Sequence, residues 1–505
     1  MARSGDTTRP RGVKAEFDPD FSATSRGGAV LAERVLRRLG VPRLLGQHLP
    51  ARAEQARYCS AEAAYALVAG LLLGGTGIAA AETLREDPLA AEIFGLGAGV
   101  PEEATMYRAL CDLAGLGQRL QTEAYEKAGR RITRLDMLGR DQPDPCLRRR
   151  VPAEPEAMDP VRREALRTLE RSVARRCYES LERKQTLLAG FHLLFGDATD
   201  LEVEGRCFDA ARMGRTGEKI LRWATVMLGP VLISQELMAG NADEGRALPA
   251  VVRAAAQSVD ELAGKPGRVL ALLDSAYLEL AVLEVLLGLH WKFIIGANQW
   301  RDILTRLAGE QPEMIWVATG ADAARDWAES GVAVFTHRAH GWPQALTIVA
   351  RRWRETKDLP GAAWHTSFLA TNLEKADLPV GFLKRHHYGP ALWALYSTKQ
   401  GREDQYKTAL IDLGLHHPAS GRLGVNQALY ALGAVAFNVA MVMRHRVLAE
   451  PDAGMRLWRM RELYFRLAGY LVRTGRRLIV RLAGASVHAR RQVLWDGAWA
   501  RAASL

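Results

Sequence analysis

Strand-length apolar runs and helix-length amphipathic segments follow one another through the middle of the chain. Residues 189–199, 201–208 and 221–238 are predicted as three consecutive strands, with a turn at Gly229-Pro230 as an alternative within the third. A helix, a strand, a second helix and a last strand follow them, up to residue 299. Consecutive strands suit antiparallel pairing, and helix-connected strands suit parallel pairing. We therefore expect a mixed α/β sheet with helices on its faces.

The pattern changes after this block. Residues 300–389 hold further β-rich segments that charged, Gly or Pro turns separate, and helical periodicity resumes in residues 390–450. The expected core is therefore in two parts, 189–299 and 390–450, interrupted by a β-rich insertion. Residues 428–443 form the longest apolar stretch, and Asn438 interrupts it. This stretch is short for a membrane span and predicts a buried helix.

The two ends of the chain are predicted to be helical. Residues 1–137 contain short amphipathic segments punctuated by Gly and Pro, and we expect an N-terminal helical DNA-binding region. A helix-turn-helix would give this pattern, and so would any small helical bundle. Residues 138–188 predict a charged linker followed by a solvated helix. Residues 451–505 predict a helical, basic C-terminal region.

Charge favours a polyanionic partner. The 505 residues carry a formal charge of +11, with a pI near 9.5. Residues 455–505 hold eleven Arg against two acidic residues, a local +9, which leaves +2 for the rest of the chain. The five Cys are scattered without metal-binding spacing, and no secretory signal is visible. We expect a cytoplasmic protein.

Three carboxylates stand where apolar segments end or a helix is expected. The predicted strand order is that of the RNase H-like fold, in which the first and fourth strands are neighbours. Asp197 ends the first of these strands and Asp274 ends the fourth. Glu403 lies on a helix predicted over residues 391–414. Converging carboxylates suit a pair of Mg²⁺ or Mn²⁺ ions that acts on phosphodiesters.

Neighbouring acids compete for two of these positions. Asp200 is an alternative to Asp197, although it lies three residues further from the strand. Asp404 is adjacent to Glu403. Tyr396 and Lys399 precede Glu403 by seven and four residues, which on one helix places all three on one face. Arg402 would lie off that face and is a weaker candidate for a contact to DNA phosphate near the metals.

Tyr396, Lys399 and Glu403 match a Tyr-x2-Arg-x3-Glu-x6-Lys signature, with Lys in place of Arg. On these residues, and on the Asp197-Ala-Thr and Asp274-Ser motifs, the chain resembles DDE-type bacterial insertion-sequence transposases. That group has an RNase H-like core interrupted by a β-rich insertion. Leu410 stands where the signature has its last Lys, and Lys407 is the nearest substitute.

The resemblance implies a chemistry and a set of partners. Asp197, Asp274 and Glu403 would hold two Mg²⁺ or Mn²⁺ ions. The DNA contacts would come from residues of the signature, the insertion and the basic C-terminus: Tyr396, Lys399, Lys407, Trp300, Arg473, Arg476 and Arg477. The partners would be double-stranded DNA, as transposon ends and target, and further copies of the chain in a homodimer or synaptic assembly. No membrane is expected, and the protein would lie with the bacterial nucleoid.

The function expected from this is transposition by cut-and-paste. The enzyme would bind terminal inverted repeats, cleave DNA with a divalent metal and transfer the strand. Two alternatives stay open. Leu410 favours a catalytically silent DNA-binding descendant, and an RNase H-like nuclease without strand transfer would have the same carboxylates.

Overall fold

The computed structural model describes residues 23–505 apart from several segments. The segments outside the described residues are 97–98, 117–157, 182–186, 189, 204–207, 209, 215–216, 241–243, 263–267, 299–302, 305–314, 318–326, 356–357, 359–363, 386, 476 and 485–488. Of a few residues inside elements only the backbone is described, Glu403 and Arg477 among them. Trp300, Arg476 and most of the predicted linker therefore lie outside the described residues.

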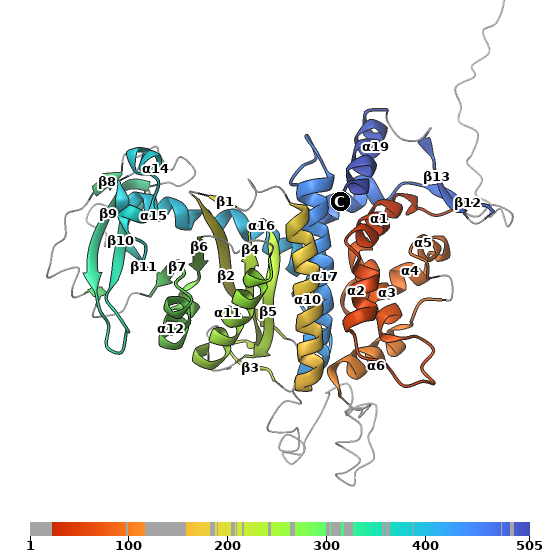
Figure 1. Ribbon diagram of the computed structural model, residues 1–505, viewed down its shortest axis with the longest axis horizontal. Coiled ribbons are helices and arrows are strands. Elements are labelled where there is room, and N and C mark those ends of the chain that lie inside the picture. The colour runs from red at the N-terminus through yellow and green to blue at the C-terminus, as the bar shows by residue number, and fades with distance from the viewer. Residues whose placement is uncertain are drawn as a thin grey trace, which may run out of the picture.

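One mixed sheet organises the middle of the chain (Figure 1). Its first strands are β2 (Phe191–Glu202), β4 (Lys219–Leu228) and β5 (Val231–Ala239), and they pair antiparallel in the order β5-β4-β2. On the other side of β2, β6 (Val269–Leu273) and then β7 (Lys292–Ala297) pair in parallel. The order β5-β4-β2-β6-β7 confirms the predicted RNase H-like arrangement.

The prediction was wrong about which residues form the second and third strands. Residues 201–208 were predicted as a strand, but β2 itself runs on to Glu202, and the described residues that follow it are irregular. The apolar run 221–238 is instead two strands, β4 and β5, joined at Gly229-Pro230. Gly229 has a φ of 57°, a left-handed conformation that glycine adopts without strain, so the run can reverse direction there.

The insertion extends the same sheet. Its last strand, β11 (His365–Thr371), pairs antiparallel with β7, and the sheet continues in the order β11-β10-β9-β8. These outer strands are β10 (Leu346–Glu355), β9 (Trp327–His337) and β8 (Ile315–Val317). The short strands β1 (Leu187–Leu188) and β3 (Arg212–Met213) pair with β2 and β4. The core and the insertion therefore share a continuous backbone hydrogen-bond network.

Two long helices stand between the sheet and the N-terminal helices (Figure 1). They are α10 (Pro160–Ser180) and α17 (Leu423–Val442), and both contact β5. Helices α11 (Glu244–Asp260) and α12 (Leu280–Gly288) connect β5 to β6 and β6 to β7. The predicted helix-connected part of the core is therefore confirmed.

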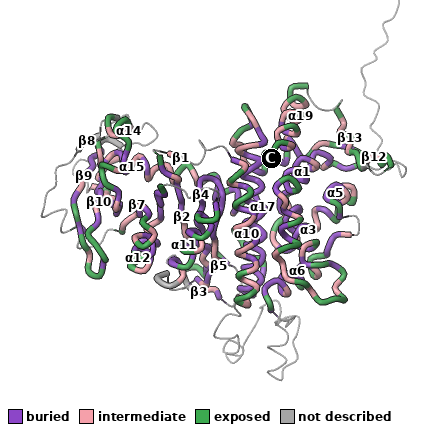
Figure 2. The backbone as a smooth tube through the Cα atoms, in the orientation of Figure 1, coloured by how far each residue is buried: buried purple, intermediate pink, exposed green. Residues whose placement is uncertain are grey.

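Every residue of α17 is buried, as Figure 2 shows along its length. Among the described residues, 423–447 form a helix long and apolar enough to cross a membrane. Helices 60–73 and 77–85 reach that length and hydropathy only when the bent pair is taken together. The most apolar part of 423–447 is 100% buried inside the protein. Asn438 satisfies the backbone of β5, since its Nδ2 donates to Leu232 O and its Oδ1 accepts from Leu232 N, both at 2.8 Å. The predicted buried helix is confirmed.

The N-terminal helices pack against the far side of α17. They are α1 (Val30–Arg38), α2 (Val41–His48), α3 (Ser60–Leu73), α4 (Glu82–Arg85), α5 (Pro88–Ile93) and α6 (Glu103–Ala114). Arg461 joins them to the C-terminal region, because its Nε and Nη2 donate to Leu72 O (2.8 Å) and Leu71 O (2.6 Å) at the end of α3. Leu71 O also accepts from the Gly74 N–H at the C-cap of α3, at 3.3 Å, and the carbonyls of a last helical turn are those that a side chain can reach.

The C-terminal region was expected to be helical, but it also contains two strands. Between α18 (Leu457–Met460) and α19 (Ala489–Ala503) lies a hairpin of β12 (Gly469–Thr474) and β13 (Arg477–Leu482). Val472, Ile479 and Val480 favour extended structure, and Gly475 supplies the turn with a φ of 56°. The density of Arg in this segment obscured that preference.

Candidate active site

Asp197 and Asp274 lie next to each other on neighbouring parallel strands, at the point where the pairing of β2 with β6 stops. Asp274 follows the end of β6, as predicted. The prediction that Asp197 ends its strand was wrong, because β2 runs on to Glu202 in its pairing with β4. Gly196 of β2 pairs with Leu273 of β6, and the Asp274 N–H donates to Gly196 O at 3.2 Å. A Cβ at Gly196 would come within 2.4 Å of Leu273 Cδ2, so glycine lets the two strands meet closely here. Both carboxylates are partly exposed. The strand order thus places the two residues on adjacent strands, as predicted.

Tyr396 and Lys399 reach the same part of the sheet. The Tyr396 hydroxyl donates to Leu273 O at 3.2 Å, one residue before Asp274. Lys399 Nζ donates to Asp197 Oδ1 at 3.0 Å, and Thr199 Oγ1 donates to Asp197 Oδ2 at 3.1 Å. The Asp197 carboxylate is therefore held in one orientation by two donors on opposite oxygens.

The prediction that Tyr396, Lys399 and Glu403 share one helical face was wrong. Helix α15 (Tyr388–Ser397) ends before Lys399, a 3₁₀ turn covers Gln400–Arg402, and α16 (Glu403–Lys407) begins at Glu403. Gly401 in this stretch weakens a continuous helix. Tyr396 and Lys399 still point at the carboxylates, because the chain turns over this part of the sheet. The Glu403 side chain lies outside the described residues.

Three tyrosines line the floor beneath the carboxylates, and two of them were missed in the sequence. Tyr277 OH lies 3.2 Å from Thr225 O, and Thr225 Oγ1 donates to the Tyr406 hydroxyl at 3.4 Å. Burial raises the pKa of Tyr277, Tyr396 and Tyr406, and the negative charges of Asp197 and Asp274 raise it further. The phenols therefore stay neutral, and they form a buried, uncharged part of the site beside the carboxylates. Tyr277 and Tyr406 each follow a predicted carboxylate by three residues, which is the signal that could have found them.

Three of the other predicted DNA contacts, Lys407, Arg473 and Arg477, lie among the described residues, and within that part of the chain none of them is seen in contact with the carboxylates. Lys407 ends α16 and is exposed, and Leu410 is partly buried against the core within a π-helical turn, Thr408–Asp412. Arg473 pairs with Glu92 of α5 at 2.9 Å, beside the N-terminal helices (Figure 1). Arg477 begins β13 in the same hairpin. The C-terminal arginines thus belong to a different surface from the carboxylates.

The donor set suits a hard divalent cation. Asp197 and Asp274 offer carboxylate oxygens from adjacent strands, and Mg²⁺ and Mn²⁺ prefer such ligands. Among the side chains that the structure describes, no group of three metal-ligating residues occurs, and the third predicted ligand, Glu403, is not among them. Lys399 places its own positive charge next to Asp197, at the position where a metal cation would bind.

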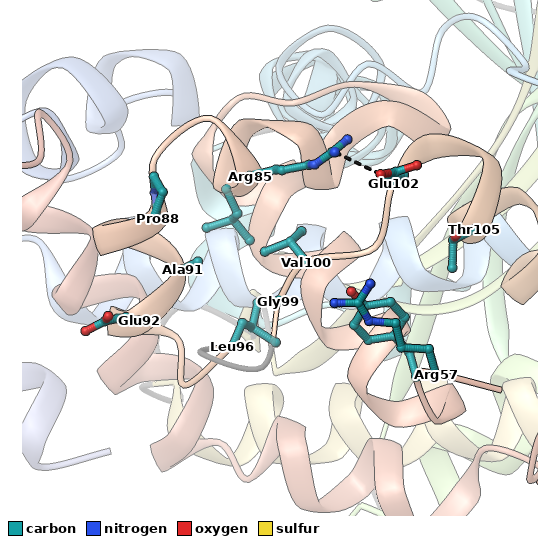
Figure 3. A pocket seen from close by; sticks show the side chains of 12 residues that line it. Arg57, Arg85, Pro88, Ala91, Glu92, Leu96, Gly99, Val100, Glu102 and Thr105 are labelled. Atoms are coloured by element: carbon teal, nitrogen blue, oxygen red, sulfur yellow. Dashed lines mark hydrogen bonds and ion pairs between the residues drawn. The ribbon is translucent and has the colours of Figure 1, made fainter. Parts of the chain in front are cut away.

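A pocket of about 460 Å³ lies elsewhere, within the N-terminal helices (Figure 3). Arg57, Arg85 and Glu102 are among its lining residues. Arg85 bridges to Glu102 at 2.8 Å, the contact dashed in Figure 3, so its charge is already paired. The lining comes from residues 57–105 alone, and the pocket is therefore separate from the Asp197 and Asp274 carboxylates.

A sheet of this order with acids on adjacent central strands is the arrangement of metal-dependent enzymes that cut nucleic acids. Residues 228–498 match the family model described as Transposase DDE domain group 1, which is more than half of the chain. The chain belongs to this family, whose chemistry is DNA transposition. The matched residues include Asp274, Tyr396, Lys399 and Glu403, and they begin after Asp197. DDE transposases generally use divalent metals for DNA cleavage and strand transfer.

Other comparisons add little. No curated protein matches the chain. A solved piggyBac transposase synaptic complex with hairpin DNA is similar at 11% identity, over 73% of this chain and 71% of that one, with a TM-score of 0.36. That score is too low to support a further statement about this chain.

Proposed function

We propose that this chain is an insertion-sequence transposase that binds the terminal inverted repeats of its own element, cleaves the DNA and joins the freed ends to a target. The observation that carries this is the position of Asp197 and Asp274 on adjacent parallel strands, with Lys399 3.0 Å from Asp197. Asp197, Asp274 and Glu403 would hold two Mg²⁺ or Mn²⁺ ions. When bound, such ions activate the attacking oxygen and stabilise the leaving one.

The chain's own residues would orient the carboxylates and the DNA. Thr199 and Lys399 each donate to a different oxygen of Asp197, which fixes the orientation of the carboxylate and of its remaining lone pairs. Tyr396 fixes the backbone before Asp274. Lys399 would turn to a DNA phosphate once a divalent ion neutralises Asp197. Lys407, exposed on α16, would supply the phosphate contact that Leu410 cannot.

The remaining contacts belong to the same proposal. Residues 1–137 would recognise the repeats, Trp300 would stack on a DNA base, and Arg473, Arg476 and Arg477 would bind the phosphate backbone. Two or more copies would hold both transposon ends in a synaptic assembly in the bacterial cytoplasm. Excision would follow a cut-and-paste route.

Leu410 favours a second candidate, a silent DNA-binding descendant, because its side chain packs on the core and offers no cation. The test is a joining assay with a duplex that carries the element's own ends, a target plasmid and Mg²⁺. Asp274→Asn is compared with Asp200→Asn, since Asp200 is exposed and pairs with Arg222 at 2.7 Å.

We expect joined product from the wild type and Asp200→Asn, and none from Asp274→Asn. Binding without cutting in all three proteins would establish the silent descendant. Nicked DNA that is never joined would establish a nuclease. Loss of activity in Asp200→Asn alone would move the first ligand from Asp197 to Asp200.

A further inference from the structure

Arg402 lies over the same face of the sheet as Asp197. Its guanidinium carbon is 4.7 Å from the centre of the Phe195 ring. Phe195 and Asp197 are two residues apart on β2, so their side chains project from the same face, about 7 Å apart along the strand. Arg402 also directly precedes Glu403. This cation therefore lies close to Asp197, on the same face of β2.

Arg444 is a second arginine near this part of the sheet. It lies in the turn Met443–Val447 that follows α17, close to Asp404. Only 8% of Arg444 is exposed, and its Nε and Nη1 have no hydrogen-bond partner in the described part of the chain. Its acidic neighbour Asp404 is 3.8 Å from Nη2, a long ion pair, and the Asp404 side chain is 55% exposed. A buried guanidinium with unmet donors costs free energy unless an acceptor reaches it.

The charges around this pair are unbalanced. Burial lowers the pKa of Arg402, and the charge of Arg444 lowers it further. Burial also lowers the pKa of Arg444. Burial and the two arginines lower the pKa of His445 to about 4, so this imidazole is neutral and adds no charge of its own. Two acids among the described side chains, Asp404 and Asp412, act in the other direction and raise the pKa of Arg444. Asp412 is already paired with Arg456 at 2.5 Å, which leaves the solvated Asp404 to balance Arg444.

Arg461 shows what a buried arginine with a structural role looks like in this protein. It is exposed to the same 8%, but its Nε and Nη2 both donate to carbonyl oxygens at the end of α3. Arg444 has the same burial without such partners. Packing therefore does not account for the placement of Arg444, whereas an anion that enters between Arg402 and Arg444 would.

We propose that Arg402 and Arg444 form a clamp for one backbone phosphate of the DNA strand that Asp197 and Asp274 act on. This rests on the proposed function and adds two DNA-positioning residues to it. A phosphate accepts hydrogen bonds from two guanidinium groups at once. Phosphates of one strand advance about 3.4 Å each along the duplex axis. The clamp would therefore hold a phosphate within a nucleotide or two of the one being cut.

The test measures binding of a short generic duplex, without terminal repeats, over a range of salt concentrations. Ca²⁺ is present, because oxygen ligands hold it and it neutralises the carboxylates. The proteins are full-length wild type, Arg402→Gln, Arg444→Gln and the double variant. Arg175→Gln is the matched control, since it removes the same charge from an exposed arginine paired with Glu179 on α10.

We expect the double variant to bind about tenfold more weakly than Arg175→Gln, with a slope of log affinity against log salt smaller by about 0.9, one phosphate contact. Affinity and slope equal to those of Arg175→Gln would overturn the clamp. Thermal unfolding separates a structural role, because removing two repelling buried cations should leave the melting temperature unchanged or raise it. A lowered melting temperature with an unchanged salt slope would assign the pair to packing instead.

The clamp and the proposed function fail in different ways. If the wild type joins ends but the clamp variants behave as the control does, only the clamp is wrong. If the wild type neither binds the duplex nor joins ends, the proposed function itself is wrong.

Discussion

Lys399 Nζ lies 3.0 Å from Asp197 Oδ1, and the two side chains are only 15% and 26% exposed. An ammonium group thus neutralises the carboxylate that the proposed mechanism assigns to metal binding. Partial burial makes this attraction stronger than it would be in water. A divalent cation that enters the site must compete with Lys399 for Asp197.

This competition predicts the effect of Lys399→Met. Because the ammonium is gone, we expect Mn²⁺ to bind the DNA-free protein more tightly, by a factor of roughly three to ten, a little over 1 kcal/mol at the upper end. DNA joining should fall at the same time, because a phosphate contact is lost. Calorimetric titration with Mn²⁺ measures the first effect. Lys407→Met, at an exposed position, is the control, and equal Mn²⁺ affinity in both variants would contradict the competition.

Lys407 is predicted to matter for DNA and not for metal. It is exposed at the end of α16, whereas Leu410, three residues on, packs against the core. We expect Lys407→Gln to weaken binding of transposon-end DNA and to slow cleavage by about tenfold, with an unchanged unfolding midpoint, because one phosphate contact is removed. Leu410→Lys in that background should not restore activity, since its side chain faces the core. Full activity of Lys407→Gln would exclude this substitute role.

Asn438 is predicted to be essential for stability despite its apolar surroundings. Asn438→Leu would leave both Leu232 N–H and Leu232 C=O without their partners in the interior. We expect a loss of about 2 to 5 kcal/mol in the free energy of unfolding. Urea unfolding checks this, with Val161→Ala, at a residue 76% exposed, as the neutral comparison. An Asn438→Leu protein as stable as the wild type would show that the amide does not hold β5.

Glu170 makes stability depend on pH. It is buried on α10, and Gln235 Nε2 donates to its Oε1 at 2.7 Å. Burial is the main reason that its pKa rises from 4.5 to about 8. Between these values the folded state holds a proton that the unfolded state has released. The free energy of unfolding should therefore fall by up to about 1.4 kcal/mol per pH unit as the pH rises through that window.

Glu170→Gln keeps an acceptor for Gln235 and cannot titrate. Its free energy of unfolding should lack this contribution, so the difference between variant and wild type grows from about pH 5 to pH 8. Denaturant unfolding at several pH values measures it. Parallel pH profiles for the two proteins would mean that Glu170 is not protonated in the folded state.

The core of the fold follows from patterns that a sequence shows directly. The apolar runs before Asp197 and Asp274, with helical segments between them, were enough to predict adjacent parallel strands. The run 221–238 was predicted as one strand because its apolar residues continue on both sides of Gly229-Pro230, and the turn given there only as an alternative is the one that forms. Pairing between distant segments, such as β7 with β11, depends on tertiary contacts that no local pattern records.

The site was predicted where chemistry and strand ends coincide, and missed where side chains arrive from elsewhere. Tyr396 and Lys399 were found from their spacing, although the helix assumed for them breaks at Ser397. Arg444 lies some forty residues after Arg402, in the turn that follows a mostly apolar helix. Its position near Asp404 depends on the tertiary packing of α17, which the sequence does not reveal.

The most direct test of the central claim is anomalous diffraction from crystals of the protein bound to a transposon-end duplex and Mn²⁺. The account predicts Mn²⁺ between the carboxylates of Asp197 and Asp274, with Glu403 completing the site at about 2.1 to 2.2 Å, a ligand distance like that of Mg²⁺. Mn²⁺ bound away from Asp197 and Asp274, with DNA cleavage intact, would contradict it.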